Sequence, residues 1–311
     1  MNLQQLDYIV ALDQHRHFAK AAEACYVTQA TLSMMVKKLE DELEVVLFDR
    51  SRQPVIPTEA GRVVIEQAKT VLRDAASIKQ YCSELKSGTK GELKIGIIPT
   101  LAPYLLPLLL PGFLREYPDV KLRIQEETTE QILNLLRADK IDVGIMATPL
   151  PETDFRLTHL FYEEFKVFVA SPDKQYKKKY ILPEDIDVNQ LWLLEEGHCL
   201  RSQVLNLCEL QRKQAHAHNL YYDTGSIESL VRITEINQGV TIVPELSTLQ
   251  MNASEKEKIH PFKPPVPARE ISLVTYRHFM KEKLLQVLQN SIVACTSPYI
   301  KNRKDNQVIG F

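Results

Sequence analysis

The clearest candidates for chemistry are two cysteines nine positions apart, Cys199 and Cys208, with His198 directly before the first. A cysteine reacts as its thiolate, and an ordinary thiol with a pKa of about 8.5 is only a few per cent ionised at neutral pH. A neighbouring positive charge, or the N–H groups at the start of a helix, stabilises the anion. His198, Arg201 and a helix that begins near Cys199 would therefore activate this cysteine.

The composition limits the kind of protein that carries this pair. With 311 residues, 25% of them charged and 44% hydrophobic, the chain is long enough for about two or three globular units. Its five cysteines are scattered and form no C-x-x-C pair, so neither a disulfide framework nor a metal site is expected. The chain opens without a signal-peptide pattern and lacks the ~18 consecutive apolar residues of a membrane span, which predicts a cytoplasmic protein without membrane contact.

The first 60 residues predict a helix-turn-helix followed by a small hairpin. Apolar residues recur at helical spacing up to a break at residues 26–27, after which Thr28 can cap the next helix. We expect the exposed side of that helix to read DNA bases, through Gln29, Thr31, Ser33 and Lys37. The hairpin would form a wing whose Arg50 and Arg52 contact phosphates. Spacing alone fits an ordinary helical hairpin equally well.

The motifs in this region resemble the winged helix-turn-helix of LysR-type transcriptional regulators. The matching stretches are residues 18–22 (FAKAA), 28–33 (TQATLS), 38–43 (KLEDEL), 47–50 (LFDR) and 57–61 (PTEAG). Two departures are Ala30, where the family often has proline, and the apolar pair Met34 and Met35, where polar residues are common. The resemblance implies that residues 1–58 bind double-stranded operator DNA.

A heptad seam follows the predicted wing. Its apolar positions alternate steps of four and three: Val64, Ala68, Val71, Ala75, Ile78, Cys82 and Leu85. This period predicts that residues 59–91 form a helix that pairs two chains, with a hinge at residues 87–91. Cys82 is most simply a small core residue of that seam.

From residue 92 onward, strands and helices alternate, which predicts an α/β fold with a largely parallel sheet. The predicted strands are residues 93–98, 120–124, 141–146, 165–170, 191–194, 220–222, 240–243 and 271–276, and the predicted helices are 103–117, 129–140 and 281–295. This order resembles the regulatory half of LysR-type proteins, which has the two-lobed fold of periplasmic binding proteins. The resemblance implies a regulatory domain at 92–311, with lobe I at 92–162 and 268–298 and lobe II at 163–267.

Further stretches resemble the peroxide-responsive members of this family: residues 97–100 (IIPT), 103–107 (PYLLP) and 198–201 (HCLR), with Gln203 and Cys208. The resemblance implies a peroxide pocket beside Cys199, formed by Thr100, Thr129, His198, Gln203 and Arg269. Simpler roles remain open for several of these residues. Thr100 and Thr129 can serve as helix caps, Arg269 as an interlobe ion pair, and His198 as a packing residue.

The same resemblance implies a reversible disulfide between Cys199 and Cys208. If this segment is helical, the two Cα atoms lie about 13 Å apart, whereas a disulfide needs less than about 7 Å. Bond formation would therefore require the segment to be remodelled. Oxidation of Cys199 to a sulfenic acid and condensation with Cys208 would act as a conformational switch.

These observations predict a peroxide-activated transcription factor that needs no cofactor and is not an enzyme. The implied partners are operator DNA, hydrogen peroxide, RNA polymerase, a cellular thiol reductant and further copies of the chain, as a homodimer that assembles into a homotetramer. Two alternatives remain. A metabolite-sensing regulator would bind an effector between the lobes and ignore peroxide, and a thiol peroxidase would need a dedicated reductant.

Overall fold

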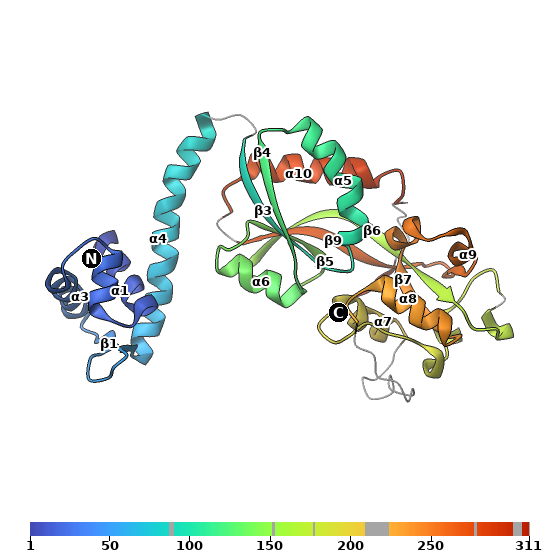
Figure 1. Cartoon of the computed structure of the whole chain (residues 1–311), viewed down its shortest axis with the longest axis horizontal. Coiled ribbons are helices and arrows are strands. Elements are labelled where there is room, and N and C mark those ends of the chain that lie inside the picture. Colours follow the sequence, from blue (N-terminus) through green and yellow to red (C-terminus); the bar gives the residue numbers. More distant parts are fainter. Residues whose placement is uncertain are drawn as a thin grey trace. The chain divides into compact units, whose positions relative to one another are not determined.

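The computed structural model describes residues 1–86, 90–150, 153–176, 178–208, 224–276, 279–300 and 307–310. The chain divides into two compact units, Met1–Gly88 and Thr89–Phe311 (Figure 1). Among the described residues, no helix has the length and apolar character needed to cross a membrane.

The first unit is a winged helix-turn-helix. It contains α1 (Leu3–His15), α2 (Phe18–Ala24), α3 (Gln29–Leu43) and the antiparallel pair β1 (Phe48–Asp49) and β2 (Ile56–Pro57). Thr28 caps α3, because its hydroxyl accepts a hydrogen bond from the Thr31 amide at 3.2 Å. Buried residues of all three helices form one core, which includes Leu12, Leu32 and Leu39. The helices and the hairpin predicted from the sequence are therefore confirmed.

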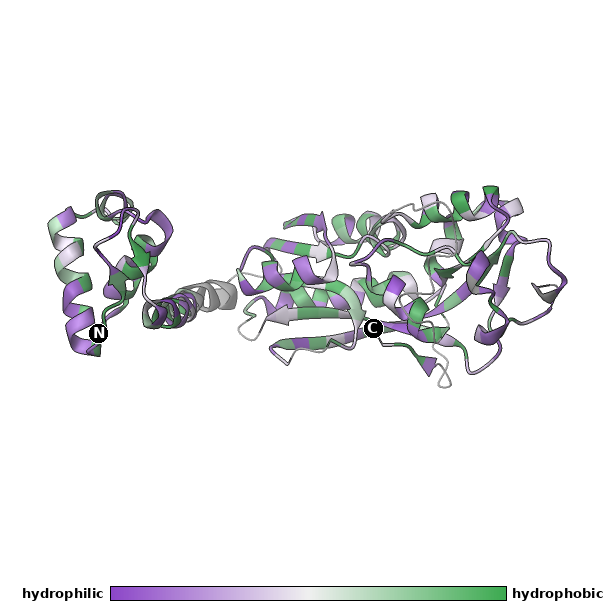
Figure 2. Cartoon of the chain, turned by 90° about the horizontal axis from the view of Figure 1, so that it is seen from below, coloured by the Kyte–Doolittle hydropathy of each residue, from purple (hydrophilic) through white to green (hydrophobic). Residues whose placement is uncertain are grey.

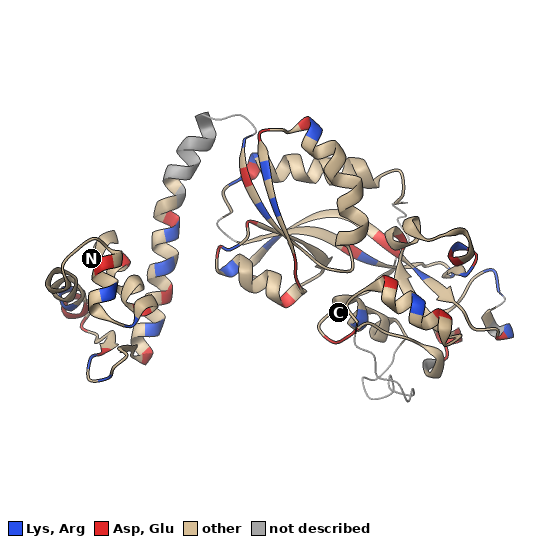
Figure 3. Cartoon of the chain, viewed as in Figure 1, with Lys and Arg blue, Asp and Glu red and all other residues tan. Residues whose placement is uncertain are grey.

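Helix α4 (Glu59–Lys86) follows the wing. Ile65 and Ala68, near its start, are buried in the core of the winged helix-turn-helix. Farther along, Val71 and Ile78 are exposed by 42% and 65%, and residues of both charge signs are interspersed along the helix (Figure 3). The first part of the predicted seam thus packs against the core of its own winged helix-turn-helix. The side chains of Cys82 and Leu85, and hinge residues 87–89, lie outside the described residues.

The second unit is built on one eight-stranded mixed sheet with the strand order β4-β3-β5-β9-β6-β7. Its strands are β3 (Gly91–Ile97), β4 (Val120–Glu126), β5 (Val143–Thr148), β6 (Phe155–Val169), β7 (Val240–Pro244) and β9 (Pro267–Tyr276), with β8 (Ile259–Pro261) on β6 and β10 (Gln307–Val308) on β9. Strand β3 is parallel to β4 and β5, as predicted, whereas β6 and β9 run antiparallel to each other. The other described strand pairs are antiparallel except for β10, which is parallel to β9, so the expectation of a largely parallel sheet was wrong.

The helices of this unit belong to two lobes (Figure 1). Helices α5 (Ala102–Glu116), α6 (Thr129–Arg137) and α10 (Glu282–Thr296) accompany strands β3 to β5, and α7 (Cys199–Leu207), α8 (Ile227–Ile236) and α9 (Ala253–Lys256) accompany β7 and β8. The long strands β6 and β9 pair along most of their length and run through both lobes. Hydrophobic and hydrophilic residues alternate along the elements (Figure 2), as expected where one face of an element is buried.

Two predicted strands need comment. Residues 191–194 form no strand, only an isolated bridge from Leu191 to Val240. Leu191, Trp192 and Leu194 are buried there, but the segment is held by single bonds, such as the one from the Trp192 amide to the Val240 carbonyl at 2.9 Å, instead of a ladder. The apolar run therefore predicted burial correctly and strand pairing wrongly. Residues 220–222 lie outside the described residues.

Candidate functional site

The carboxyl ends of two parallel strands place the predicted threonines at one edge of the sheet. Ile97, the last residue of β3, pairs with Glu126, the last residue of β4. Thr100 follows β3 by three positions and Thr129 follows β4 by three positions, so both lie just beyond the same edge. Such edges are the usual ligand sites of parallel sheets.

Cys199 is the first residue of α7 and is 7% exposed. Burial raises the pKa of its thiol. The positive charge of Arg269, the hydroxyl of Thr129, and the N–H groups of Leu200 and of Cys199 itself act in the opposite direction. The net direction is upward, so the reduced protein holds a protonated thiol surrounded by groups that favour its anion. Of the three activating features predicted from the sequence, the start of a helix is present.

Thr129 is not a helix cap. The neighbouring Thr128 caps α6, where its hydroxyl accepts a bond from the Gln131 amide and the Gln131 side chain accepts one from the Thr128 amide at 3.0 Å. The Thr129 hydroxyl is buried and has no hydrogen-bond partner of ordinary geometry among the described residues, yet it lowers the pKa of Cys199. It is therefore available as a donor to the Cys199 anion.

Arg269 is completely buried on β9, opposite Glu163 on β6. Its Nε lies 2.9 Å, and its Nη2 2.8 Å, from Oε2 of Glu163. The same guanidinium donates to the Thr100 hydroxyl at 2.9 Å and to the Thr100 carbonyl at 3.1 Å. Arg269 is thus an ion-pair residue and also a neighbour of the predicted pocket. Because the Thr100 oxygen accepts from Arg269, its own O–H proton is free to donate elsewhere.

Three other residues near Cys199 contact partners other than its thiol. His198 is buried, with its Nε2 3.2 Å from a carboxylate oxygen of Glu195. Arg201 donates to the Leu194 carbonyl at 2.7 Å and so holds the loop before α7. Gln203 is fully buried, and its Nε2 donates to the Ile309 carbonyl at 3.0 Å. The structure therefore brings Arg269 and Thr129 close to Cys199, whereas Arg201 and the Gln203 amide nitrogen are engaged elsewhere.

A cavity of about 370 Å³ lies beside His198, between segments of the two lobes. Its lining includes four carboxylates: Glu126, Glu127, Glu195 and Glu228. A Cβ atom at position 225 would lie 2.8 Å from His198 Nε2, so glycine allows the backbone at Gly225 to approach the His198 ring closely. The cavity offers a polar, acidic approach to the segment that carries Cys199.

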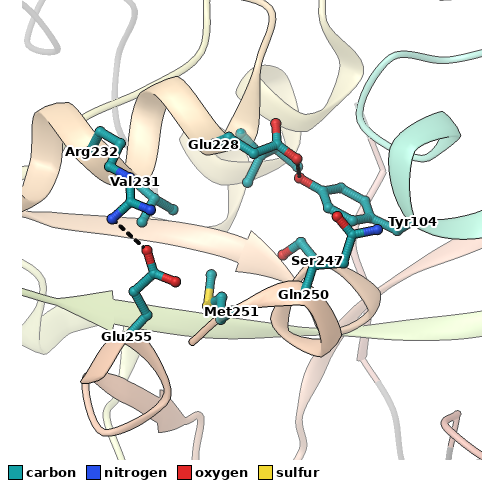
Figure 4. Close-up of a pocket in the computed structure, with 9 residues that line it drawn as sticks. Tyr104, Glu228, Val231, Arg232, Ser247, Gln250, Met251 and Glu255 are labelled. Atoms are coloured by element: carbon teal, nitrogen blue, oxygen red, sulfur yellow. Dashed lines mark hydrogen bonds and ion pairs between the residues drawn. The ribbon is translucent and has the colours of Figure 1, made fainter. Parts of the chain in front are cut away.

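A smaller cavity of about 120 Å³ lies around Tyr104 (Figure 4). The Tyr104 hydroxyl donates to Glu228 at 2.7 Å and thereby joins α5 to α8 across the lobes, while Arg232 pairs with Glu255 at 2.7 Å. Burial and the Glu228 carboxylate raise the pKa of Tyr104, which keeps it a donor. The described residues that line this cavity include no cysteine.

Cys208 closes α7 at its C-terminal end and is half-buried, and burial raises the pKa of its thiol to about 12. Both Cys199 and Cys208 are free thiols. Because α7 is helical from Cys199 to Leu207 and Cys208 caps it, the Cα atoms of the two cysteines are about 13 Å apart, well beyond disulfide distance. The reduced structure therefore cannot form the bond without unwinding α7.

The predicted DNA-contacting residues lie on α3 and on the wing. Gln29 and Lys37 are exposed on α3, and Thr31 and Ser33 are half-buried there. Met34, which departs from the family pattern, is 63% exposed on the same helix. Arg52 is exposed on the wing, although its Nε lies 3.3 Å from a carboxylate oxygen of Asp49. Arg50 pairs at 2.5 Å with Glu40, which is more deeply buried than Asp49, and this pair restricts the reach of Arg50 toward phosphates.

The two units together define a DNA-binding domain joined to an effector-responsive domain, as in many bacterial regulators. Comparison with known families agrees: residues 3–62 match the bacterial regulatory helix-turn-helix protein, lysR family, and residues 86–293 match the LysR substrate binding domain. The chain belongs to the LysR family of transcriptional regulators.

Its relatives within that family include proteins named for their response to peroxide. The "Hydrogen peroxide-inducible genes activator" of Haemophilus influenzae is 34% identical over 88% of this chain and 90% of the relative. The "DNA-binding transcriptional dual regulator OxyR" of Escherichia coli is 34% identical over 88% and 89%.

Solved structures show the same likeness. A full-length OxyR mutant from Pseudomonas aeruginosa superposes with a TM-score of 0.68 at 34% identity, over 95% of this chain and 98% of that one. An H2O2-bound OxyR mutant from Corynebacterium glutamicum gives 0.61 at 28% identity, over 99% and 98%.

Proposed function

We propose that this chain is a transcription factor that senses hydrogen peroxide through a reversible Cys199–Cys208 disulfide and activates antioxidant genes. The relatives named for peroxide support the signal. The observation that carries the proposal is the buried Thr129 hydroxyl, which has no ordinary partner among the described residues and lies where it favours the Cys199 anion. A hydroxyl placed only for folding would be expected to have a partner.

In this mechanism, the Cys199 thiolate attacks one oxygen of hydrogen peroxide and the O–O bond breaks. The departing hydroxide takes up the proton that the thiol releases, which leaves a sulfenic acid and water. Thr129 and Thr100 are the hydroxyl donors for the reacting groups, and Arg269 supplies fixed positive charge. Because the guanidinium is already held by Glu163 and Thr100, it needs no rearrangement during the reaction.

The second step joins the sulfenic acid to the Cys208 thiol and releases a second water. Since α7 keeps the two residues about 13 Å apart, the step requires α7 to unwind. The new conformation would change how regulatory domains pair, and α4 would carry that change to the winged helices in a homodimer and homotetramer. Both redox forms would bind operator DNA, the oxidised form would recruit RNA polymerase productively, and a cellular thiol reductant would reset the switch.

Peptide mass spectrometry after brief peroxide exposure tests the chemistry, with Cys199→Ser and Cys208→Ser as variants. Cys295→Ser is the matched control, because Cys295 is also half-buried and burial raises its pKa to about 11. We expect a Cys199–Cys208 disulfide in the parent protein and in the control only. A protein that ignores peroxide but responds to a small metabolite would be the metabolite-sensing regulator, and rapid catalytic turnover of peroxide would make it a thiol peroxidase.

A further inference from the structure

The last described residues of the chain pack against both the α7 helix and the strand that carries Arg269. Strand β10 runs parallel to β9, with the Gln307 amide donating to the Val266 carbonyl and the Ile309 amide donating to the Ala268 carbonyl, both at 2.9 Å. The Ile309 side chain is buried in the core of the regulatory unit. This segment is therefore docked by backbone pairing and by apolar burial.

Two side chains of α7 hold the same segment from the other side. Gln203 Nε2 donates to the Ile309 carbonyl at 3.0 Å, and Asn206 Nδ2 donates to the Gly310 carbonyl at 3.1 Å. The two residues are three positions apart on the helix, so they lie on one face of it. Both are located between Cys199 and Cys208, in the stretch that must change shape before a disulfide can form.

We propose that residues 307–310 are a latch that holds α7 in its helical, reduced form, with Gln203 and Asn206 as the positioning residues that engage it. The inference rests on the proposed function. Unwinding α7 moves both amide side chains away from the Ile309 and Gly310 carbonyls, so the latch stabilises the dithiol form relative to the disulfide. The reduction potential of the switch therefore depends on the latch as well as on the local chemistry of the two cysteines.

The test is the equilibrium between dithiol and disulfide, measured with the full chain in buffers of reduced and oxidised glutathione. In that exchange the two protein thiols become a disulfide, and one glutathione disulfide becomes two glutathione thiols. Removal of residues 307–311 should favour the protein disulfide about tenfold, which equals a potential about 30 mV more negative. Asn206→Ala, which loses a single bond on an exposed side chain, should give roughly a threefold shift, or about 15 mV.

Asn237→Ala is the matched control. Asn237 is also exposed at the end of a helix, and its Nδ2 donates to a carbonyl, that of Ile233, at 2.8 Å, but it belongs to α8. Its substitution should leave the potential unchanged. Asn206→Asp, whose ionised carboxylate cannot donate, should behave like Asn206→Ala and decides the question if the shortened chain folds poorly.

The possible results distinguish a failure of the latch from a failure of the proposed function. An unchanged or less negative potential in the Asn206 variants overturns the latch while leaving the peroxide switch intact. If the parent protein forms no Cys199–Cys208 disulfide at any buffer ratio, the proposed function itself fails.

Discussion

Replacing Thr129 with valine separates a sensing role from a folding role at one position. Valine keeps the shape of threonine and removes the hydroxyl, which has no ordinary partner among the described residues. A buried, unpaired hydroxyl costs about 1–3 kcal/mol of stability. The Thr129→Val protein should therefore unfold with an unchanged free energy, or with one raised by about 1 kcal/mol.

The rate of the peroxide reaction, in contrast, should fall. The Thr129 hydroxyl lowers the pKa of Cys199, so its loss leaves less thiolate at a given pH. A hydrogen bond to a charged group contributes about 1.5–3 kcal/mol. If the bond to the anion is lost in full, the rate of Cys199 oxidation falls roughly 10- to 150-fold.

The assay is the rate of Cys199 oxidation under excess peroxide, with samples quenched by alkylation and analysed by mass spectrometry. Thr128→Val is the matched control, because it removes the hydroxyl that caps α6. That variant should lose about 1 kcal/mol of stability and keep its reaction rate. The reasoning is refuted if Thr129→Val reacts at the parent rate, or if Thr128→Val slows the reaction as strongly.

Three further predictions follow from the same geometry. Cys208→Ser should trap Cys199 as a sulfenic or overoxidised acid, and a normal disulfide signal in that variant would show that another cysteine resolves it. Arg52→Ala should weaken binding to all DNA sequences and flatten its salt dependence in titrations from low to high salt, because Arg52 is 68% exposed on the wing; a change confined to base preference would contradict this. The rate of Cys199 oxidation should rise about tenfold per pH unit from pH 6 to 8, because burial raises the thiol pKa and only the anion reacts; a rate that levels off below pH 7 would contradict the raised pKa.

The sequence predicted the secondary-structure elements better than it predicted which side chains contact each other. Helical spacing and turn residues located the winged helix-turn-helix, and the expected helix near Cys199 is confirmed as α7. Thr128 and Thr129 show the limit, since both are good capping residues and adjacent in the chain. Only the path of the chain into α6 decides which hydroxyl caps the helix and which faces Cys199.

Long-range pairing explains most of what the sequence left open. Arg269 and Glu163 are 106 positions apart and meet because β6 and β9 run side by side. The contact of Gln203 with Ile309 spans a similar separation and depends on β10 pairing with β9. Neither local propensity nor apolar periodicity records such contacts, so Gln203 was predicted to line the pocket while its amide nitrogen is bound to the end of the chain.

The raised pKa of Cys199 bears on what limits the proposed switch. A protonated, buried thiol reacts slowly with most reagents, so sensitivity must come from the groups that favour the anion at the moment of reaction, namely Arg269 and Thr129. The disulfide then forms only if its free energy exceeds the cost of unwinding α7, including the two bonds to residues 309 and 310. The first requirement governs the rate of sensing and the second governs the equilibrium. Substitutions at Thr129 should therefore change the rate of oxidation with little effect on the reduction potential, whereas substitutions at Asn206 should change the potential with little effect on the first oxidation step.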